Sequence, residues 1–276
     1  MTTARKTQIG LITTAVVLFV LLFLAPKTYT GKSHEESMPA TLETTANVET
    51  FLTTALKTMK PADKTTYDEV LATATKSKAD TAFATVVEFW DKQKRPDLAA
   101  YFVEQMADKK QTSAAYMKAG DRYYYSVRFT KDDNEIPALY QSARRCYQKA
   151  VDKDPKNTDA KIQLAACFVE EGKDPMKGVG MLREVEKTDS NNVKLQLTFA
   201  FFSVKSQQWD KAIKRFNNVL RIDPLYIEAY LHLADAYEQQ GQTEKTIEML
   251  TKYASLTDDA MAKNEVLKYI EQLKNK

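Results

Sequence analysis

The chain has 276 residues, of which only 7 are glycine and 8 proline, a composition that favours long helices joined by short turns. Its 40 lysines and arginines nearly balance its 37 aspartates and glutamates, so it lacks the basic excess typical of proteins that bind nucleic acid. We therefore expect neither a β-rich fold nor a nucleic-acid partner.

The first apolar segment lies near the N-terminus. Residues 9–25 read IGLITTAVVLFVLLFLA, carry no charge and follow the pair Arg5 and Lys6. As a helix of about 1.5 Å per residue, this segment would span about 25 Å, close to the thickness of a hydrocarbon core. The pattern predicts a transmembrane anchor over residues 1–26. A cleaved signal peptide is the alternative, but Pro26 and the residues before it do not form a small-x-small cleavage site.

The charges on either side of the anchor predict its orientation. Arg5 and Lys6 lie before it, whereas Lys27 and Lys32 are diluted by two glutamates after it. The positive-inside rule then places the N-terminus in the cytoplasm. For a bacterial protein this predicts a single-pass inner-membrane protein whose main domain lies in the periplasm.

Residues 27–46 are polar, contain Gly31 and Pro39, and show no sustained apolar period, which predicts a tether. Residues 47–112 carry apolar side chains at helical spacing in four successive segments. The predicted helices carry Val48 to Met59, Tyr67 to Ala74, Phe83 to Trp90, and Leu98 to Met106. Pro61 ends the first of them and Pro96 begins the last.

A repeat emerges further along the chain. The segment Trp209 to Pro224 reads WDKAIKRFNNVLRIDP, and it resembles the second helix of a tetratricopeptide (TPR) repeat. The family's small, aromatic, aliphatic and proline positions fall on the residues Ala212, Phe216, Val219 and Pro224. A fuller copy upstream has Ala143, Tyr147, Ala150 and Pro155, and a poorer one has Gly178, Leu182, Val185 and Ser190. The last positions lie one repeat length apart, since 190 − 155 = 35 and 224 − 190 = 34.

The first helices of the repeats agree with this register. The family's large–small pair followed by an aromatic residue matches Leu164-Ala165 with Phe168, and Leu233-Ala234 with Tyr237. Gly172 and Gly241 fall where the first helix turns into the second. The resemblance implies an all-α solenoid of helical hairpins wound as a right-handed superhelix. Its segments are the TPR repeats 113–157, 158–192, 193–226 and 227–260, a TPR-like hairpin at 79–112 and a capping helix at 261–276.

Two features lie outside the regular repeat. The first repeat exceeds the 34-residue period by 45 − 34 = 11 residues, and the excess, Arg128 to Pro137, is predicted to be an exposed loop. In the capping helix, Val266, Leu267, Ile270 and Leu273 are predicted to share one apolar face.

The residues that carry most enzyme chemistry are scarce. The only histidines are His34 and His232, and no phosphate-binding GxxxxGK[ST] or GxSxG motif occurs. Cys146 and Cys167 match no metal-binding spacing, and they are either buried free thiols or a disulfide between neighbouring helices. We therefore expect no enzyme, no cofactor and no metal site.

The resemblance implies a binding groove on the concave face, formed by the first helix of each repeat. The candidate groove residues are Met117, Lys118, Asp121, Tyr124, Tyr125, Ile162, Gln163, Val169, Leu197, Phe201, Leu231, His232 and Asp235. Apolar residues of this set should either form an open strip for a peptide or fill the groove from within.

The chaperone-binding subset of the family holds a C-terminal carboxylate with five clamp residues. Here those positions carry Met117, Asp121, Gln163, Lys194 and Thr198, and only Lys194 matches. A ligand that ends in an EEVD-like carboxylate is not expected.

The predicted function is a membrane-anchored scaffold or adaptor that binds proteins at the cell envelope, for example during assembly of other envelope proteins. The membrane contact would be residues 9–25 and the partner a protein or peptide in the groove. Two alternatives remain: a structural protein that forms homo-oligomers, and an accessory subunit similar to those of cytochrome c biogenesis or to periplasmic chaperones.

Overall fold

A computed structural model of the chain describes residues 47–77, 79, 81–130 and 132–275, which belong to one compact unit. The predicted anchor and tether, residues 1–46, lie outside the described residues. Within the described ranges, no helix combines the length and the apolar character that a membrane crossing requires.

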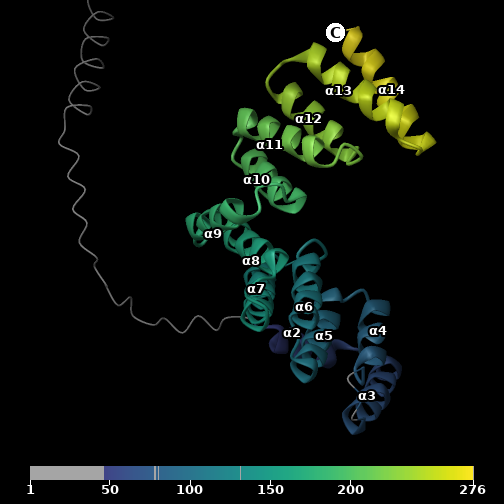
Figure 1. The fold of residues 1–276 in the computed structure, drawn as a ribbon. Coiled ribbons are helices and arrows are strands. Elements are labelled where there is room, and N and C mark those ends of the chain that lie inside the picture. Colours follow the sequence, from purple (N-terminus) through teal and green to yellow (C-terminus); the bar gives the residue numbers. More distant parts are fainter. Residues whose placement is uncertain (1–46, 78, 80, 131, 276) are drawn as a thin grey trace, which may run out of the picture. The chain divides into compact units, whose positions relative to one another are not determined.

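The described part is built from helices without strands, as the composition predicted (Figure 1). The N-terminal helices are α2 (Val48–Thr58), α3 (Pro61–Lys76), α4 (Ala84–Lys92) and α5 (Pro96–Lys110). The helices of the four predicted repeats are α6 (Ser113–Ser126), α7 (Ile136–Lys153), α8 (Thr158–Glu171), α9 (Pro175–Thr188), α10 (Val193–Lys205), α11 (Trp209–Ile222), α12 (Glu228–Gln239) and α13 (Thr243–Leu256). A last helix, α14, runs over Ala260–Lys274.

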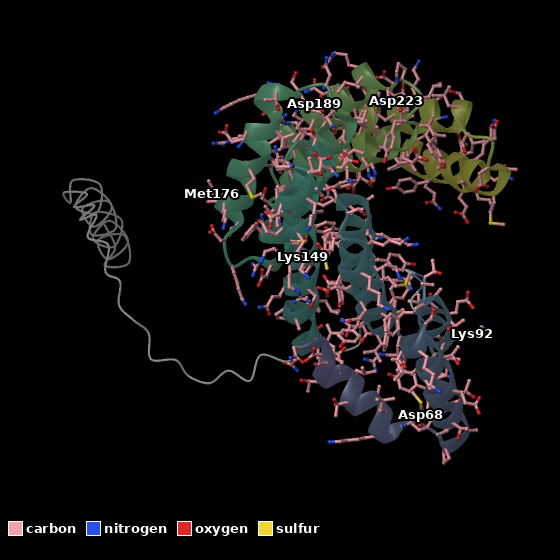
Figure 2. The ribbon with its side chains drawn as sticks, turned by 60° about the horizontal axis from the view of Figure 1, so that its bottom comes forward. Asp68, Lys92, Lys149, Met176, Asp189 and Asp223 are labelled. Carbon is pink, nitrogen blue, oxygen red and sulfur yellow. The ribbon has the colours of Figure 1, made fainter. Side chains whose placement is uncertain are left out.

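From α4 onward, helices pack mainly against their neighbours in sequence, as a TPR-like solenoid requires. The first helices of successive repeats also meet, because α6 contacts α8 and α8 contacts α10. Figure 2 shows the corresponding ends of two second helices, marked by Asp189 after α9 and Asp223 after α11. These aspartates are one repeat apart, since 223 − 189 = 34.

Side chains and glycines fix the ends of the repeat helices. Asn157 and Asn192 cap α8 and α10, where each side-chain oxygen accepts a hydrogen bond from a backbone N–H in the first turn. Gly172 and Gly241 adopt positive φ angles of 78° and 70° at the predicted turns. In the third repeat Gln207 takes the same left-handed conformation with φ 55°, without a glycine.

The small residue at the start of each second helix allows a close helix contact. Ala143 and Ala212 are fully buried. A Cβ atom on Gly178 would lie 2.4 Å from the carbonyl oxygen of Ala165, so α9 approaches α8 more closely than an alanine would permit. Thr246 replaces the small residue in the last repeat and is also buried, and its hydroxyl donates to the carbonyl of Gln242 at 3.2 Å. Each of these positions thus lies at a close contact between helices.

The insertion in the first repeat is only partly a loop. Backbone hydrogen bonds hold a turn after α6, a short 3-10 helix covers Asp133–Glu135, and α7 begins at Ile136. Pro137 therefore belongs to the first turn of a helix, where its missing N–H costs nothing. The prediction of a loop through Pro137 was wrong at that end.

The first described helix does not continue the hairpin pattern. Helix α2 packs on α5 and α7, and a single buried cluster extends from Val48 to Cys167. Cys146 and Cys167 both lie in this cluster as buried free thiols, which settles the alternative left open by the sequence. Burial raises the pKa of both thiols above the ordinary value, so they remain protonated.

The last helix covers the end of the repeats. Ile270 and Leu273 of α14 are buried, and Val266 packs partly against them. Leu267 is 43% exposed, so its placement on the buried face was wrong. It follows Val266 by one residue, which turns it about 100° away around the helix.

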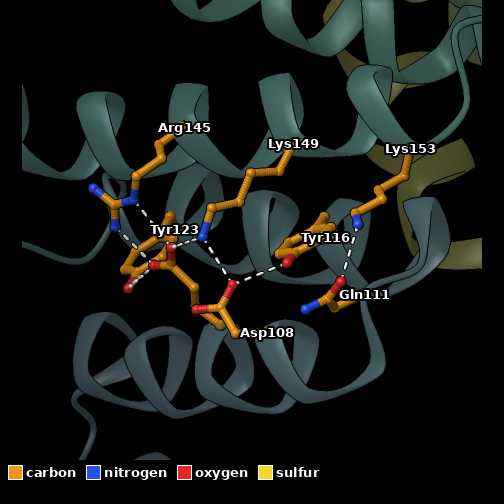
Figure 3. Close-up of polar contacts among 8 residues, drawn as sticks. Asp108, Gln111, Tyr116, Tyr123, Arg145, Lys149 and Lys153 are labelled. Atoms are coloured by element: carbon orange, nitrogen blue, oxygen red, sulfur yellow. Dashed lines mark hydrogen bonds and ion pairs between the residues drawn. The ribbon is translucent and has the colours of Figure 1, made fainter.

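A polar cluster joins α5, α6 and α7 (Figure 3). We call it the Glu104 cluster and define it by Glu104, Asp108, Tyr123, Arg145 and Lys149. The buried Glu104 carboxylate accepts from Tyr123 Oη at 3.0 Å and from Arg145 Nε and Nη2 at 3.0 and 2.7 Å. Lys149 Nζ lies 3.4 Å from the same carboxylate and 2.8 Å from Asp108. Every charge in the Glu104 cluster thus has a partner from a neighbouring helix.

Burial alone would raise the pKa of Glu104. The hydrogen bond and charge of Arg145, the Tyr123 hydroxyl and the charge of Lys149 together outweigh burial and hold that pKa below its ordinary value. Glu104 is therefore ionised in the folded protein at neutral pH.

Candidate functional site

The predicted groove residues lie on the first helices of the four repeats. They are Met117, Lys118, Asp121, Tyr124 and Tyr125 on α6, Ile162, Gln163 and Val169 on α8, Leu197 and Phe201 on α10, and Leu231, His232 and Asp235 on α12.

A hollow of about 280 Å³ opens among α6, α7, α8 and α10, and we call it the concave hollow. Four of its seven lining residues belong to the predicted set: Asp121, Tyr124, Tyr125 and Gln163. The other three were not among the candidates: Arg128, Tyr147 and Lys194. The hollow therefore joins three consecutive repeats.

Tyr147 reaches the hollow because Gly120 has no side chain. A Cβ atom on Gly120 would lie 2.6 Å from Cε1 of the Tyr147 ring, so any larger residue would displace the ring. The sequence placed Tyr147 at the aromatic position of the second helix, a core position. Tyr147 is indeed fully buried, and it also lines the hollow beside Asp121.

One carboxylate connects three helices at the hollow. Tyr147 Oη donates to Asp121 Oδ1 at 2.8 Å, and Gln163 Nε2 donates to the same oxygen at 3.4 Å. Burial, with the negative charge of Asp121, raises the pKa of Tyr147 well above its ordinary value. The phenol thus stays protonated and remains a donor. These bonds fix α6, α7 and α8 around the hollow.

Aromatic rings form one wall and the rim. Tyr124 is partly buried, and its ring meets the edge of Tyr140 at a centroid distance of 5.8 Å. Tyr125 and Phe129 pack against each other at 4.7 Å, yet each remains 52% exposed. Exposed aromatic pairs of this kind offer a large apolar surface to a partner.

Two cations face the hollow from different repeats. Arg128 follows Tyr124 by four residues, in the turn after α6, and Lys194 lies in the first turn of α10. Within the described residues, no carboxylate lies within ion-pair distance of Arg128. Lys194 has one distant partner, Asp159 at 3.7 Å. Extending the α6 face by one more turn would have identified Arg128 from the sequence.

Other predicted groove residues serve packing. Ile162 is fully buried in a cluster with Leu182 and Leu195, so it offers no surface to a ligand. Leu197 packs partly against the cluster around Phe216. A Cβ atom on Gly178 would lie 2.7 Å from Val169 Cγ2, which places Val169 against α9.

His232 belongs to an aromatic group on α10, α11 and α12. Its ring stacks on Phe216 at 5.0 Å and meets Phe201 edge-on at 4.9 Å. Burial lowers the pKa of His232, against the opposing charges of Asp235 and Glu228. Phe201 is 41% exposed, but one side of its ring is committed to this group.

The remaining members surround these features. Met117 packs partly against the large core cluster and Leu231 against the cluster beneath α14, whereas Lys118 and Asp235 are exposed. In the described part of the chain, no group of three or more histidine, cysteine, aspartate or glutamate side chains is arranged to hold a metal ion.

Comparison with known proteins identifies the repeats. A family model described as "TPR repeat" matches residues 204–241, and one described as "Tetratricopeptide repeat" matches residues 228–256. Residues 204–256 are therefore similar to TPR repeats, and the matches overlap the third and fourth repeats predicted from the sequence.

A curated relative and two solved structures resemble parts of the chain. Superkiller protein 3 of Schizosaccharomyces pombe is 27% identical over 148 residues, which cover 47% of this chain and 11% of that protein. The crystal structure of YrrB, described as a TPR protein with an unusual peptide-binding site, is similar with a TM-score of 0.42 and 19% identity, over 69% of this chain and 92% of that one. Residues 41-end of MamA from Desulfovibrio magneticus RS-1 are similar with a TM-score of 0.47 and 14% identity, over 67% and 99%.

Proposed function

We propose that this protein is a membrane-anchored TPR scaffold that binds a segment of another protein in the concave hollow. The observation that carries the proposal is the exposed Tyr125–Phe129 pair beside a hollow whose cations lack close partners. Elsewhere on the same face, the apolar side chains of Ile162 and Leu197 are already used in packing.

The chemistry of the hollow suits a peptide better than a small metabolite. Its volume of about 280 Å³ accommodates one or two side chains, since pockets for drug-sized ligands usually exceed about 300 Å³. Aromatic side chains at a rim commonly supply the few contacts that dominate protein binding. A partner would thus place one side chain in the hollow and an apolar neighbour on Tyr125 and Phe129.

Site-specific photo-crosslinking of the full chain in its native membrane tests this proposal. A photoreactive phenylalanine derivative replaces Tyr125 in one variant and Asn217 in a control, because both positions are exposed on helices. We expect a discrete adduct from position 125 and none from position 217. Equal adducts from both positions, or none from position 125, would overturn the assignment of the hollow as the binding site.

The membrane part of the proposal rests on the sequence. The uncharged stretch 9–25 and the preceding Arg5 and Lys6 support an anchor with the repeats on the non-cytoplasmic side. In a bacterium the partner would then be an envelope protein, and assembly of such proteins is the corresponding role. A reporter that is active only outside the cytoplasm should therefore be active when it is fused after Lys276. Activity of a reporter that functions only in the cytoplasm would reverse the topology.

Self-association is a second candidate function. Leu256, Met261 and Leu267, at the end of α13 and on α14, are 45%, 75% and 43% exposed and give the terminal hairpin apolar surface that a second copy of the chain could cover. Sedimentation of the detergent-solubilised full chain separates the two functions. A stable oligomer at low micromolar concentration that Met261→Glu dissociates would support self-association, whereas a monomer would exclude it.

A further inference from the structure

The two cations of the concave hollow, Arg128 and Lys194, belong to different repeats. Arg128 lies in the turn that begins the insertion of the first repeat, and Lys194 lies at the start of the third repeat. Backbone hydrogen bonds from Arg128 to Tyr125 and from Thr130 to Ser126 hold this turn in place. Burial raises the pKa of both Tyr124 and Tyr140, and the positive charge of Arg128 opposes that shift.

The acidic groups nearby are already engaged. Asp121, the one carboxylate that lines the hollow, accepts from Tyr147 and Gln163 through one oxygen. Glu170, whose charge adds to the effect of burial in raising the pKa of Tyr124, forms an ion pair with Lys205 at 2.8 Å. The lining side chains therefore carry two positive charges against one negative charge, and that negative charge is bound by two donors.

This arrangement discriminates between classes of ligand. A purely apolar side chain would shield Arg128 and Lys194 from water without a counter-charge, and an unpaired charge loses several kcal/mol on burial. A basic side chain would add repulsion from both cations. A carboxylate would accept charge-assisted hydrogen bonds from both, and such bonds are roughly twice as strong as neutral ones.

We propose that the concave hollow selects peptides that carry an internal acidic side chain, which pairs with Arg128 and Lys194, next to an apolar residue that covers Tyr125 and Phe129. This inference rests on the proposed function and names the chemistry of the partner. It differs from capture of a C-terminal carboxylate by a five-residue clamp, because among the clamp positions only Lys194 carries the clamp's residue type, and Arg128 belongs to the insertion.

The first test is selection from random heptapeptides by the full chain in detergent. One library is amidated at its C-terminus, so that only side chains can supply carboxylates, and a second library has free C-termini. We expect the amidated library to yield peptides enriched in aspartate or glutamate beside an apolar residue. Enrichment only from the library with free C-termini would overturn the proposal that the acidic group is an internal side chain. Enrichment of amidated peptides without acidic residues would overturn the acid preference and leave the proposed function intact, and no enrichment from either library would contradict both.

The second test measures binding of the most enriched amidated peptide and of its matched amide, in which Gln replaces Glu or Asn replaces Asp. We expect the acidic peptide to bind at least about tenfold more tightly at 50 mM NaCl, with a smaller ratio at 500 mM because salt screens partly exposed charges. Arg128→Ala and Lys194→Ala should each bring the ratio of the two affinities close to one. Arg128→Lys should leave it at an intermediate value.

Lys118→Ala provides the matched control. Lys118 is an exposed cation on α6 that does not line the hollow, so the ratio between acidic and amide peptides should change less than about twofold. An equal loss in Lys118→Ala and Arg128→Ala would show that general positive charge attracts the peptide, and it would overturn the proposed pairing.

Discussion

The Glu104 cluster and the concave hollow lie on different sides of α6, and two consecutive residues of that helix reach them. Tyr123 donates to Glu104, whereas Tyr124 lines the hollow. Both sites contain at least one tyrosine, two cations and at least one carboxylate. In the Glu104 cluster, each cation contacts a carboxylate of a neighbouring helix, but in the hollow Arg128 has no such contact within the described residues.

This difference separates charges that hold helices together from charges that remain available to a partner. The Glu104 cluster joins α5, α6 and α7, so its disruption should lower the free energy of unfolding. Neutral donors to Asp121 hold the helices around the hollow, and we expect removal of its cations to have little structural consequence.

The largest effect should come from a change inside a repeat. Ala212 is fully buried where α11 meets α10, so Ala212→Asp both overfills the contact and buries a charge. We expect a loss of about 3 kcal/mol or more in the free energy of unfolding. Asn217→Asp adds the same charge at an exposed position of α11 and should cost less than about 0.5 kcal/mol. Equal urea midpoints would contradict the assigned register.

The next effect concerns the Glu104 cluster. Glu104→Gln removes a buried charge whose partner Arg145 is about half exposed, so we expect a loss of roughly 1–3 kcal/mol at neutral pH. Glu184→Gln removes an exposed ion pair with Lys187 and should cost no more than about 0.5 kcal/mol. Chemical denaturation of both variants checks the difference.

The same variant makes a prediction about pH. Because the native pKa of Glu104 is lowered, its contribution to stability is complete above the ordinary carboxyl pKa of about 4.3 and is lost as the pH falls through the native value. The gap between the wild type and Glu104→Gln should therefore narrow below about pH 4. A gap that is unchanged at pH 3.5 would show that the charge of Glu104 does not stabilise the fold.

The smallest effect involves His232. Burial lowers the native pKa of His232, so as the pH falls the unfolded chain is protonated at this position before the folded protein. The contribution of neutral His232 to stability therefore declines as the pH falls below about 6.5. His232→Gln should unfold with a midpoint that varies less between pH 7.5 and 5.5 than that of the wild type. An identical pH dependence in the two proteins would assign the effect to other groups.

The sequence was sufficient for features that repeat. Small residues at Ala143, Gly178 and Ala212 recur one period apart because close packing of successive hairpins requires them, and the structure shows all three buried. Gly172 also has the predicted left-handed conformation.

The site depended on features that do not repeat. Arg128 lies in an insertion without a family position, and Tyr147 reaches the hollow only through the space above Gly120. Ile162 occupies a family groove position but faces Leu182 and Leu195, so family position alone did not separate packing from exposure.

Measuring stability and peptide binding on the same protein preparations tests the central claim most directly. Tyr125→Ala, Arg128→Ala and Lys194→Ala should each unfold within about 0.5 kcal/mol of the wild type and bind the acidic peptide at least about tenfold more weakly. Phe201→Ala should show the opposite pattern, with a loss of about 1–2 kcal/mol because its half-exposed ring packs on Phe216 and His232. If Tyr125→Ala lost as much stability as Phe201→Ala in the absence of a peptide, the hollow would be part of the packed core and not a binding site.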